Sequence, residues 1–310
     1  MKTGAAQTPS DLRRLNTEKA NCASADLDTK SSFEIAQVIH HEDAQVADAI
    51  KPALSQVARA IDLIAGALRS GGRLIYVGAG TSGRIAALDA AECPPTFNTD
   101  PKMVQFVIAG GAKALAAAVE ANEDSRELGQ REMAKKKPTG KDVVVGIAAS
   151  GRTPFTVAAV EYARRRGAKT IAVTCNRNSL LAKAANLAIV TEVGPEVIAG
   201  SSRMKAGTAQ KMVLNMLSTG AMTRLGFVYG NLMVNVHLKN EKLVERGVSI
   251  LQQAAGVSSQ EARKTLRAAG NDVPVALVML QARVTRSEAQ HALKAAGGNV
   301  RQAITHTRSM

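Results

Sequence analysis

The 310-residue sequence has no tryptophan, three tyrosines and five phenylalanines, so aromatic residues make up only 3% of it. Proteins that hold single-stranded nucleic acid stack its bases on aromatic side chains, so this shortage disfavours such a function. The formal net charge is +14, but the basic residues are dispersed along the chain. We interpret the charge as a basic surface that attracts anionic metabolites, and we expect no nucleic-acid partner.

Long hydrophobic runs are missing as well. No stretch reaches the roughly 18 uncharged apolar residues of a membrane-spanning helix, so we expect no membrane association. The opening stretch, MKTGAAQTPSDLRRLNTEKANCAS, lacks the apolar centre of a signal peptide. Cys22, Cys93 and Cys175 are an odd number of cysteines without a C-x-x-C pair, which disfavours a disulfide framework or a zinc site. We therefore expect a cytoplasmic protein.

Short β-rich runs alternate with helix-length segments in the middle of the chain. The predicted strands are 73–78, 103–110, 142–149, 169–175 and 187–193. The predicted helices between them are 81–91, 112–136 and 153–166. This alternation is typical of a parallel sheet covered on both faces, so the fold class is predicted to be α/β, a parallel-sheet α/β/α sandwich.

Helical patterns flank this alternation. Apolar residues recur at helical spacing across 43–69, where Pro52 should start or kink the helix. Further helices are expected at 204–225 and 231–251. The stripe at 46–68 is too apolar for a lone surface helix, which predicts a dimer. The expected division is an N-terminal arm with helices at 1–70, a sheet domain at 71–250 and a helical C-terminal region at 251–310.

The C-terminal region contains a 27-residue internal repeat. VSSQEARKTLRAAGNDVPVAL begins at Val257, and VTRSEAQHALKAAGGNVRQAI begins at Val284. The matching positions are Ala262 with Ala289, Leu266 with Leu293, Gly270 with Gly297 and Val273 with Val300. Each unit is predicted to be a short helix, a glycine stop and a second helix. The repeat resembles a duplicated ubiquitin-associated-type module, and we expect a structural or dimerisation role rather than ligand binding.

The stretch IYVGAGTSGR at 75–84 predicts a strand, a tight glycine turn and the start of a helix. Gly78, Gly80 and Gly83 have the G-x-G-x-x-G spacing of dinucleotide-binding loops. A dinucleotide site also needs a carboxylate near the end of the second strand to bind the ribose. The second predicted strand ends in IAGG at 108–111, without a carboxylate. A nicotinamide or flavin cofactor is therefore disfavoured.

A second loop repeats this design 68 residues later. VVGIAASGRT at 144–153 aligns Ser150 and Gly151 with Ser82 and Gly83. The N-terminus of a helix offers unpaired N–H groups and the positive end of the helix dipole, which together attract phosphate. Two strand-to-helix turns with matched serines therefore predict a site for one phosphate monoester.

Five longer stretches, together with these loops, resemble the N-acetylmuramic acid 6-phosphate etherase family, which has the sugar isomerase (SIS) fold. They are NCASADLD (21–28), LDAAECPPTF (88–97), AVEANEDSRE (118–127), GSSRMKAGTAQKMVLNMLSTG (200–220) and GNLMVNVHLKNEKL (230–243). The resemblance implies a cytoplasmic, cofactor-free homodimer acting on a phosphorylated amino sugar in peptidoglycan recycling. It implies cleavage of the lactyl ether to N-acetylglucosamine 6-phosphate and D-lactate.

The resemblance also assigns roles to residues. The acid of the family, in the run before Cys-Pro-Pro, matches Glu92 as proton donor, and its second carboxylate matches Glu123 as base. Spacing alone does not separate Glu123 from its acidic neighbours, Glu120, Asp124 and Glu127. The phosphate-binding hydroxyls of SIS-fold sugar binders match Ser82, Ser150 and Thr153.

Other polar residues are candidates for substrate contact. They are Ser201, Ser202, Arg203 and Lys205. Of these, Arg203 and Lys205 would neutralise the lactyl carboxylate, with a purely structural role as the alternative. The five histidines, His40, His41, His237, His291 and His306, show no metal-ligand spacing, so no metal site is expected. His237 is the strongest rival to the carboxylates if ring opening uses a histidine.

Two other functions stay open at this point. A phosphosugar aldose–ketose isomerase would need one base that moves a proton between carbons 1 and 2. A non-catalytic phosphosugar sensor would carry a DNA-binding or regulatory module, and no helix-turn-helix pattern precedes the first glycine loop.

Overall fold

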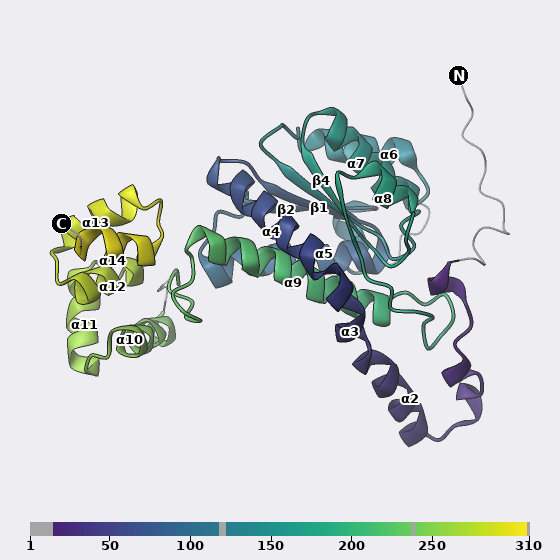
Figure 1. Ribbon diagram of the computed structural model, residues 1–310, viewed down its shortest axis with the longest axis horizontal. Helices are drawn as coiled ribbons and strands as arrows, with labels where there is room; N and C mark the ends of the chain where they lie inside the picture. Colours follow the sequence, from purple (N-terminus) through teal and green to yellow (C-terminus); the bar gives the residue numbers. More distant parts are fainter. Residues whose placement is uncertain (1–14, 118–121, 237, 239, 309–310) are drawn as a thin grey trace. The chain divides into compact units, whose positions relative to one another are not determined.

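The computed structural model describes residues 15–117, 122–236, 238 and 240–308. The chain forms two compact units (Figure 1). The first comprises Met1–Ala90 and Lys102–Leu217, and the second comprises Ala91–Pro101 and Ser218–Met310. Within the described ranges, no helix is both long and apolar enough to span a membrane.

The first unit is built on a five-stranded parallel sheet. Its strands are β1 (Leu74–Gly78), β2 (Val104–Ile108), β3 (Val143–Ile147), β4 (Lys169–Thr174) and β5 (Leu187–Val190). They lie in the order β2-β1-β3-β4-β5, so all five predicted strands and their parallel arrangement are confirmed. Gly78 at the end of β1 pairs with Ile147 at the end of β3. The loops after these strands therefore start side by side, where the strand order reverses and α/β sheets bind ligands.

Helices cover both faces of the sheet. On one face lie α6 (Arg126–Lys135), α7 (Pro154–Arg165) and α8 (Leu180–Ala184), and over the other lie α4 (Leu54–Arg69) and parts of α5 (Gly80–Phe97) and α9 (Lys205–Leu225) (Figure 1). Because strand side chains alternate between faces, Ile75 and Val77 join the core beneath α7. Tyr76 lies between them and donates a 2.8 Å hydrogen bond to Asp89 of α5 on the opposite face.

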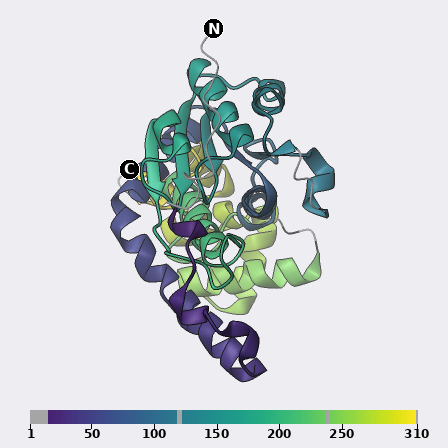
Figure 2. The ribbon, with the colours of Figure 1, turned by 90° about the vertical axis from the view of Figure 1, so that its right-hand side faces the viewer.

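The N-terminal region consists of short helices in succession. Three 3-10 turns, Asn16–Glu18, Cys22–Ser24 and Leu27–Thr29, precede α2 (Ser32–Ala44) and α3 (Val46–Ile50) (Figure 2). The prediction that Pro52 interrupts the helix is confirmed, because a 3-10 turn with Pro52 separates α3 from α4. The arm is bonded to the rest of its own unit. For example, Ser24 Oγ donates to the carbonyl oxygen of Val197 at 2.7 Å.

Three predicted helices differ from the observed ones. The segment 112–136 is not one helix, because left-handed Gly110 and Gly111 lead into a 3-10 turn and α6 begins only after Ser125. Helix α5 continues past 91 to Phe97, with Pro94 and Pro95 inside it. The helix expected from 231 begins at Glu241, where the Asn240 side chain caps α10.

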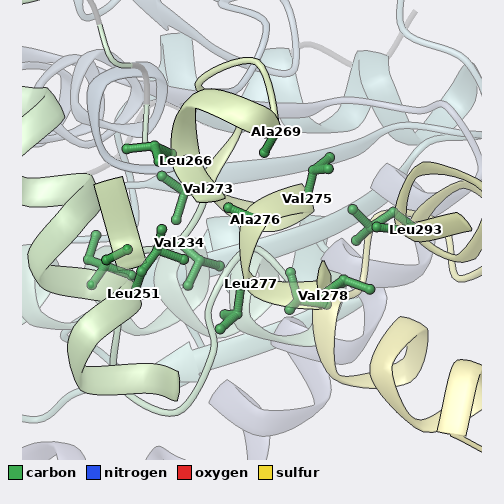
Figure 3. Packing of buried hydrophobic residues seen from close by; sticks show 14 of the residues in the cluster. Val234, Leu251, Leu266, Ala269, Val273, Val275, Ala276, Leu277, Val278 and Leu293 are labelled. Atoms are coloured by element: carbon green, nitrogen blue, oxygen red, sulfur yellow. The ribbon is translucent and has the colours of Figure 1, made fainter. Parts of the chain in front are cut away.

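The second unit is helical and contains the sequence repeat. Its helices are α10 (Glu241–Ala255), α11 (Ser259–Ala268), α12 (Val273–Ala282), α13 (Arg286–Ala295) and α14 (Val300–Arg308). The predicted pattern of helix, glycine stop and helix is confirmed, since Gly270 and Gly297 both have a positive φ. Figure 3 shows the core shared by the two repeats, to which the equivalent residues Leu266 and Leu293 both contribute. The equivalent pairs Ala262 with Ala289 and Val273 with Val300 are also buried in this core.

Candidate functional site

The first glycine loop joins β1 to α5 through close backbone approaches. A Cβ atom on Gly83 would lie 2.5 Å from Cγ1 of Ile108, and one on Gly78 would lie 2.9 Å from the Gly83 nitrogen. Gly80, the first residue of α5, has a φ of +51°. Only glycine meets these demands without strain, so the turn presents backbone N–H groups and the Ser82 hydroxyl at the start of the helix.

The second glycine loop joins β3 to α7 and is fixed by the end of β4. A Cβ atom on Gly151, where φ is +66°, would lie 2.3 Å from Ser179 Oγ. The Cys175 amide donates to the Ala149 carbonyl at 3.0 Å, which holds the loop against β4. Thr153 is the N-cap residue of α7, and its side chain makes no capping hydrogen bond. The Thr153 hydroxyl is therefore not used to satisfy its own helix.

Both loops line one cavity of about 520 Å³ in the first unit. The hydroxyl groups around it belong to Thr17, Thr81, Ser82, Ser150, Thr153 and Ser202, and the carboxylates belong to Glu18, Glu123 and Asp124. Over the part of the chain that the structure describes, no lysine, arginine or histidine lines this cavity. An anion held here would be bound through hydroxyl and backbone N–H donors rather than by an opposite charge.

Glu123 is tied to both loops. Its backbone carbonyl accepts a 3.0 Å hydrogen bond from the N–H of Phe155, in the first turn of α7. Its carboxylate approaches the first loop, since a Cβ atom on Gly80 would lie 3.0 Å from Glu123 Oε1. Of the acidic neighbours, Asp124 also lines the cavity, Glu127 does not, and Glu120 lies outside the described residues.

The N-terminal arm supplies two lining residues that sequence reasoning missed, Thr17 and Glu18. Buried Asn176 holds the arm in place, because its Nδ2 donates to the Ala149 carbonyl at 3.0 Å and to Thr17 Oγ1 at 3.4 Å. A Cβ atom on Gly200 would lie 3.3 Å from Glu18 Oε2. No periodicity marks the arm in sequence, so only its tertiary contacts with the second loop identify these residues.

The stretch 200–206 divides between the cavity and a buried polar network. Gly200 and Ser202 line the cavity, whereas Ser201 and Arg203 do not. Lys205 is buried, and its ammonium group forms an ion pair with Glu42 of α2. The buried Glu196 carboxylate caps α9 by accepting from the amides of Lys205 and Ala206 at 2.8 and 2.9 Å, and burial raises its pKa. Lys205 therefore has an ion-pair partner within the protein and does not line the cavity.

The remaining predicted residues lie elsewhere. Glu92 is an exposed residue of α5, ten positions after Ser82 on that helix, and belongs to the second unit. His237 is outside the described residues, and exposed His291 contacts the Ser287 carbonyl of its own helix at 3.1 Å. Over the described ranges, no three histidine, cysteine, aspartate or glutamate residues form a group that could hold a metal ion.

Comparisons with known proteins agree on the fold. Residues 56–164 match the glucokinase regulatory protein N-terminal SIS domain, and residues 127–220 match the SIS domain. A phosphoheptose isomerase from Neisseria gonorrhoeae aligns with a TM-score of 0.50 and 18% identity, over 62% of this chain and all of its own. The prediction of an SIS-type α/β fold is therefore confirmed.

Curated relatives are similar over most of the chain. An N-acetylmuramic acid 6-phosphate etherase from Klebsiella aerogenes is 50% identical over 297 residues, which is 96% of this chain and 99% of the relative. An etherase of the same name from Symbiobacterium thermophilum is 56% identical over 88% of this chain and 90% of its own. With half of its residues shared along nearly its whole length, the chain belongs to the N-acetylmuramic acid 6-phosphate etherase family.

Proposed function

We propose that this protein cleaves the D-lactyl ether of N-acetylmuramic acid 6-phosphate, giving N-acetylglucosamine 6-phosphate and D-lactate by elimination followed by hydration. The observation that carries the proposal is that both serine-bearing loops and Glu123 line the same cavity. Relatives that bear the name of this activity and match nearly the whole chain support it.

The phosphate group is assigned to the hydroxyls of Ser82, Ser150 and Thr153. Gly83 and Gly151 allow the turns that bring these hydroxyls and the N-termini of α5 and α7 to one place. Hydrogen bonds from such donors to a charged phosphate are stronger than bonds between neutral groups. Helix N-termini add favourable electrostatics, which compensates for the lack of a lining cation among the described residues.

The elimination step uses two carboxyl groups in different protonation states. In the open-chain form of the sugar, the proton on carbon 2 is acidic because the carbanion is delocalised into the aldehyde. Glu123, as the base, takes this proton, and its electron pair forms the double bond between carbons 2 and 3. The bond from carbon 3 to the ether oxygen breaks, and a carboxylic acid protonates the departing lactate oxygen, a role that the family resemblance assigns to Glu92.

Hydration then reverses the proton movements. Glu92, now ionised, takes a proton from water as the water oxygen adds to carbon 3, and Glu123 returns a proton to carbon 2. The net reaction consumes one water molecule, and both carboxyl groups recover their starting states. Glu123 is preferred over Asp124 as the base because its carboxylate approaches the first loop. Ser202 and Arg203 remain candidates for contact with the rest of the substrate.

The proposal includes a cytoplasmic homodimer that serves peptidoglycan recycling. Large apolar side chains on α2 and α4 support self-association, because Phe33, Leu54 and Leu63 are exposed in the single chain. Burial of such side chains against a second copy is favourable.

The activity is tested by incubating the purified protein with N-acetylmuramic acid 6-phosphate and measuring D-lactate. We expect lactate from the phosphorylated sugar and little from N-acetylmuramic acid at the same concentration. No lactate from either compound would overturn the proposal. Binding of the phosphorylated sugar without lactate would instead support the phosphosugar sensor.

A further inference from the structure

We propose that Gln210 is a positioning residue that directs the single proton of the Ser82 hydroxyl toward the bound phosphate; the inference rests on the proposed function in taking the ligand to be a phosphosugar. Gln210 lies on α9 and is 1% exposed, and Ser82 is 9% exposed. Ser82 Oγ donates to Gln210 Oε1 at 2.9 Å. The Nε2 atom of Gln210 is buried and has no hydrogen-bond partner among the described residues.

The observed bond points the Ser82 proton away from any ligand. A serine hydroxyl has one proton to donate and can accept through its oxygen. While that proton is bonded to Gln210 Oε1, Ser82 cannot donate it to a phosphate oxygen. A half-turn of the Gln210 amide about its Cγ–Cδ bond places Nε2 where Oε1 was. Nε2 then donates to Ser82 Oγ, and the serine proton is released to the phosphate.

The unpaired Nε2 atom is the reason to expect this exchange. A buried polar group without a partner is costly and calls for a functional explanation. After the half-turn, one N–H of Nε2 is bonded to Ser82 and the carbonyl oxygen becomes the unpaired atom. Unpaired buried carbonyl oxygens are tolerated more often than unpaired N–H groups. With ligand bound, the Gln210 Nε2 group donates to Ser82 and the Ser82 hydroxyl donates to the phosphate. Without ligand, Nε2 has no partner. This difference favours ligand binding.

Helix α9 lies close to the first loop, so the side chain at position 210 must both fit beside Ser82 and donate a hydrogen bond to it. A Cβ atom on Gly207, one turn before Gln210, would lie 3.5 Å from Thr81 Cγ2 and 3.7 Å from Ile85 Cδ1. Glycine at this position therefore brings α9 against the first turn of α5. Neither a glutamate nor a methionine at 210 can donate to Ser82, although both are close to glutamine in length. A glutamate would also hold the serine proton and place a negative charge near the phosphate.

The test measures the dissociation constant of N-acetylglucosamine 6-phosphate by calorimetry for wild type, Ser82→Ala, Gln210→Met, Gln210→Glu and the Ser82→Ala/Gln210→Met double variant. We expect Gln210→Met to weaken binding about fivefold and Gln210→Glu more than about tenfold. In the Ser82→Ala background, Gln210→Met should change binding by less than about twofold, because Gln210 acts through Ser82.

Matched controls are Gln253→Met and Gln253→Glu, since Gln253 donates to Ser249 Oγ at 3.0 Å in an exposed glutamine–serine pair on α10. These variants should bind like wild type. Kinetics are compared for those Gln210 variants that keep the thermal unfolding midpoint of the wild type. Each should have a raised KM for the phosphorylated substrate and a nearly unchanged kcat. A general loss of structure would lower kcat as well.

Two outcomes would overturn the inference. Effects of Ser82→Ala and Gln210→Met that multiply in the double variant would show that Gln210 does not act through Ser82. Wild-type affinity in Gln210→Glu would show that the direction of the serine proton does not matter. Failure of the proposed function is distinguishable, because it would appear as no D-lactate release by the wild-type protein, whereas the inference is tested by the binding constants alone.

Discussion

The carbonyl oxygen of Glu123 accepts a hydrogen bond from the N–H of Phe155, at 3.0 Å. This bond fixes the backbone of the candidate base to the first turn of α7, directly after the loop that carries Ser150 and Thr153. The carboxylate of Glu123 reaches toward Gly80 of the other loop. A substrate phosphate held by both loops would therefore be held at a defined position relative to Glu123.

Removal of a phosphate-binding hydroxyl should mainly weaken substrate binding. Ser150→Ala and Thr153→Ala should each cost about 1–3 kcal/mol of binding free energy, because each loses a hydrogen bond to a charged group. Michaelis constants for lactate release would measure the effect. Equal rates with phosphorylated and unphosphorylated sugar in the wild type would overturn the assignment of both loops.

The ion pair between half-buried Arg73 and buried Asp142 should make stability depend on pH. Asp142 is 2% exposed and accepts from Arg73 Nε at 3.1 Å, Arg73 Nη2 at 2.8 Å and the Thr139 amide at 2.8 Å. Burial alone would raise the pKa of Asp142, but these hydrogen bonds outweigh it and hold the pKa below its usual value. The ionised form therefore stabilises the fold above the pKa of the unfolded chain, and this stabilisation is lost as pH falls toward the folded pKa.

We expect Asp142→Asn to lower the free energy of unfolding by about 2 kcal/mol at pH 7, because it removes a buried carboxylate that accepts hydrogen bonds from a charged guanidinium. The difference from wild type should shrink below about pH 4. Urea unfolding at several pH values measures both effects. The matched control is Asp48→Asn, since Asp48 pairs with Lys51 on the surface. This substitution should change the free energy of unfolding by less than about 0.5 kcal/mol. A pH-independent difference would contradict this account.

The three cysteines should react at very different rates. Cys22 is exposed, whereas Cys93 and Cys175 are buried. Burial raises the pKa of the Cys175 thiol to about 12, so almost no thiolate is present near neutral pH. In a dithiobis-nitrobenzoate assay at pH 8, the rapid phase should disappear in Cys22→Ser. Rapid labelling of Cys175 in the native protein would show that this region opens easily.

Self-association is expected to depend on the exposed apolar residues of α2 and α4. Sedimentation velocity at micromolar concentration should give twice the 32.4 kDa mass of one chain. Phe33→Asp and Leu63→Asp should shift the protein toward monomer, because each places a charge where an apolar side chain is to be buried. A wild-type monomer at that concentration would contradict the homodimer.

The sheet was predictable from sequence because strands buried on both faces form continuous apolar runs, such as LIYVG and VVVGI. The ends of the helices were harder to predict. Proline residues such as Pro94 and Pro95 normally end a helix. Helix α5 nevertheless continues to Phe97, and the backbone N–H of Asn98 donates a hydrogen bond to the Pro94 carbonyl oxygen. Local propensity did not reveal that tertiary packing would keep this last turn helical.

The candidate site was predictable where it consists of glycine turns that follow strands. The glycines and serines of the two Ser-Gly-Arg loops were sufficient to predict the two turns. The loops lie side by side because β1 and β3 are neighbours in the parallel sheet. Thr17 and Glu18 were not predictable, because their position depends on the hydrogen bonds of distant Asn176. Lys205 could not be separated from a substrate ligand in sequence, because its partner Glu42 lies 163 residues away.

The most direct test of the two-carboxylate mechanism is exchange of the carbon-2 proton with deuterated water. N-Acetylmuramic acid 6-phosphate is incubated with Glu92→Ala, Glu123→Ala or the control Glu127→Ala, an exposed neighbour that does not line the cavity. Deuterium at carbon 2 and released D-lactate are then measured.

We predict that Glu92→Ala slows lactate release by at least ~100-fold and still exchanges the carbon-2 proton, because the base remains. Glu123→Ala should lose both activities, and Glu127→Ala should keep both. If Glu92→Ala blocks exchange while Glu123→Ala permits it, the two roles are reversed. If neither substitution slows lactate release by ~100-fold, the two-carboxylate mechanism is wrong.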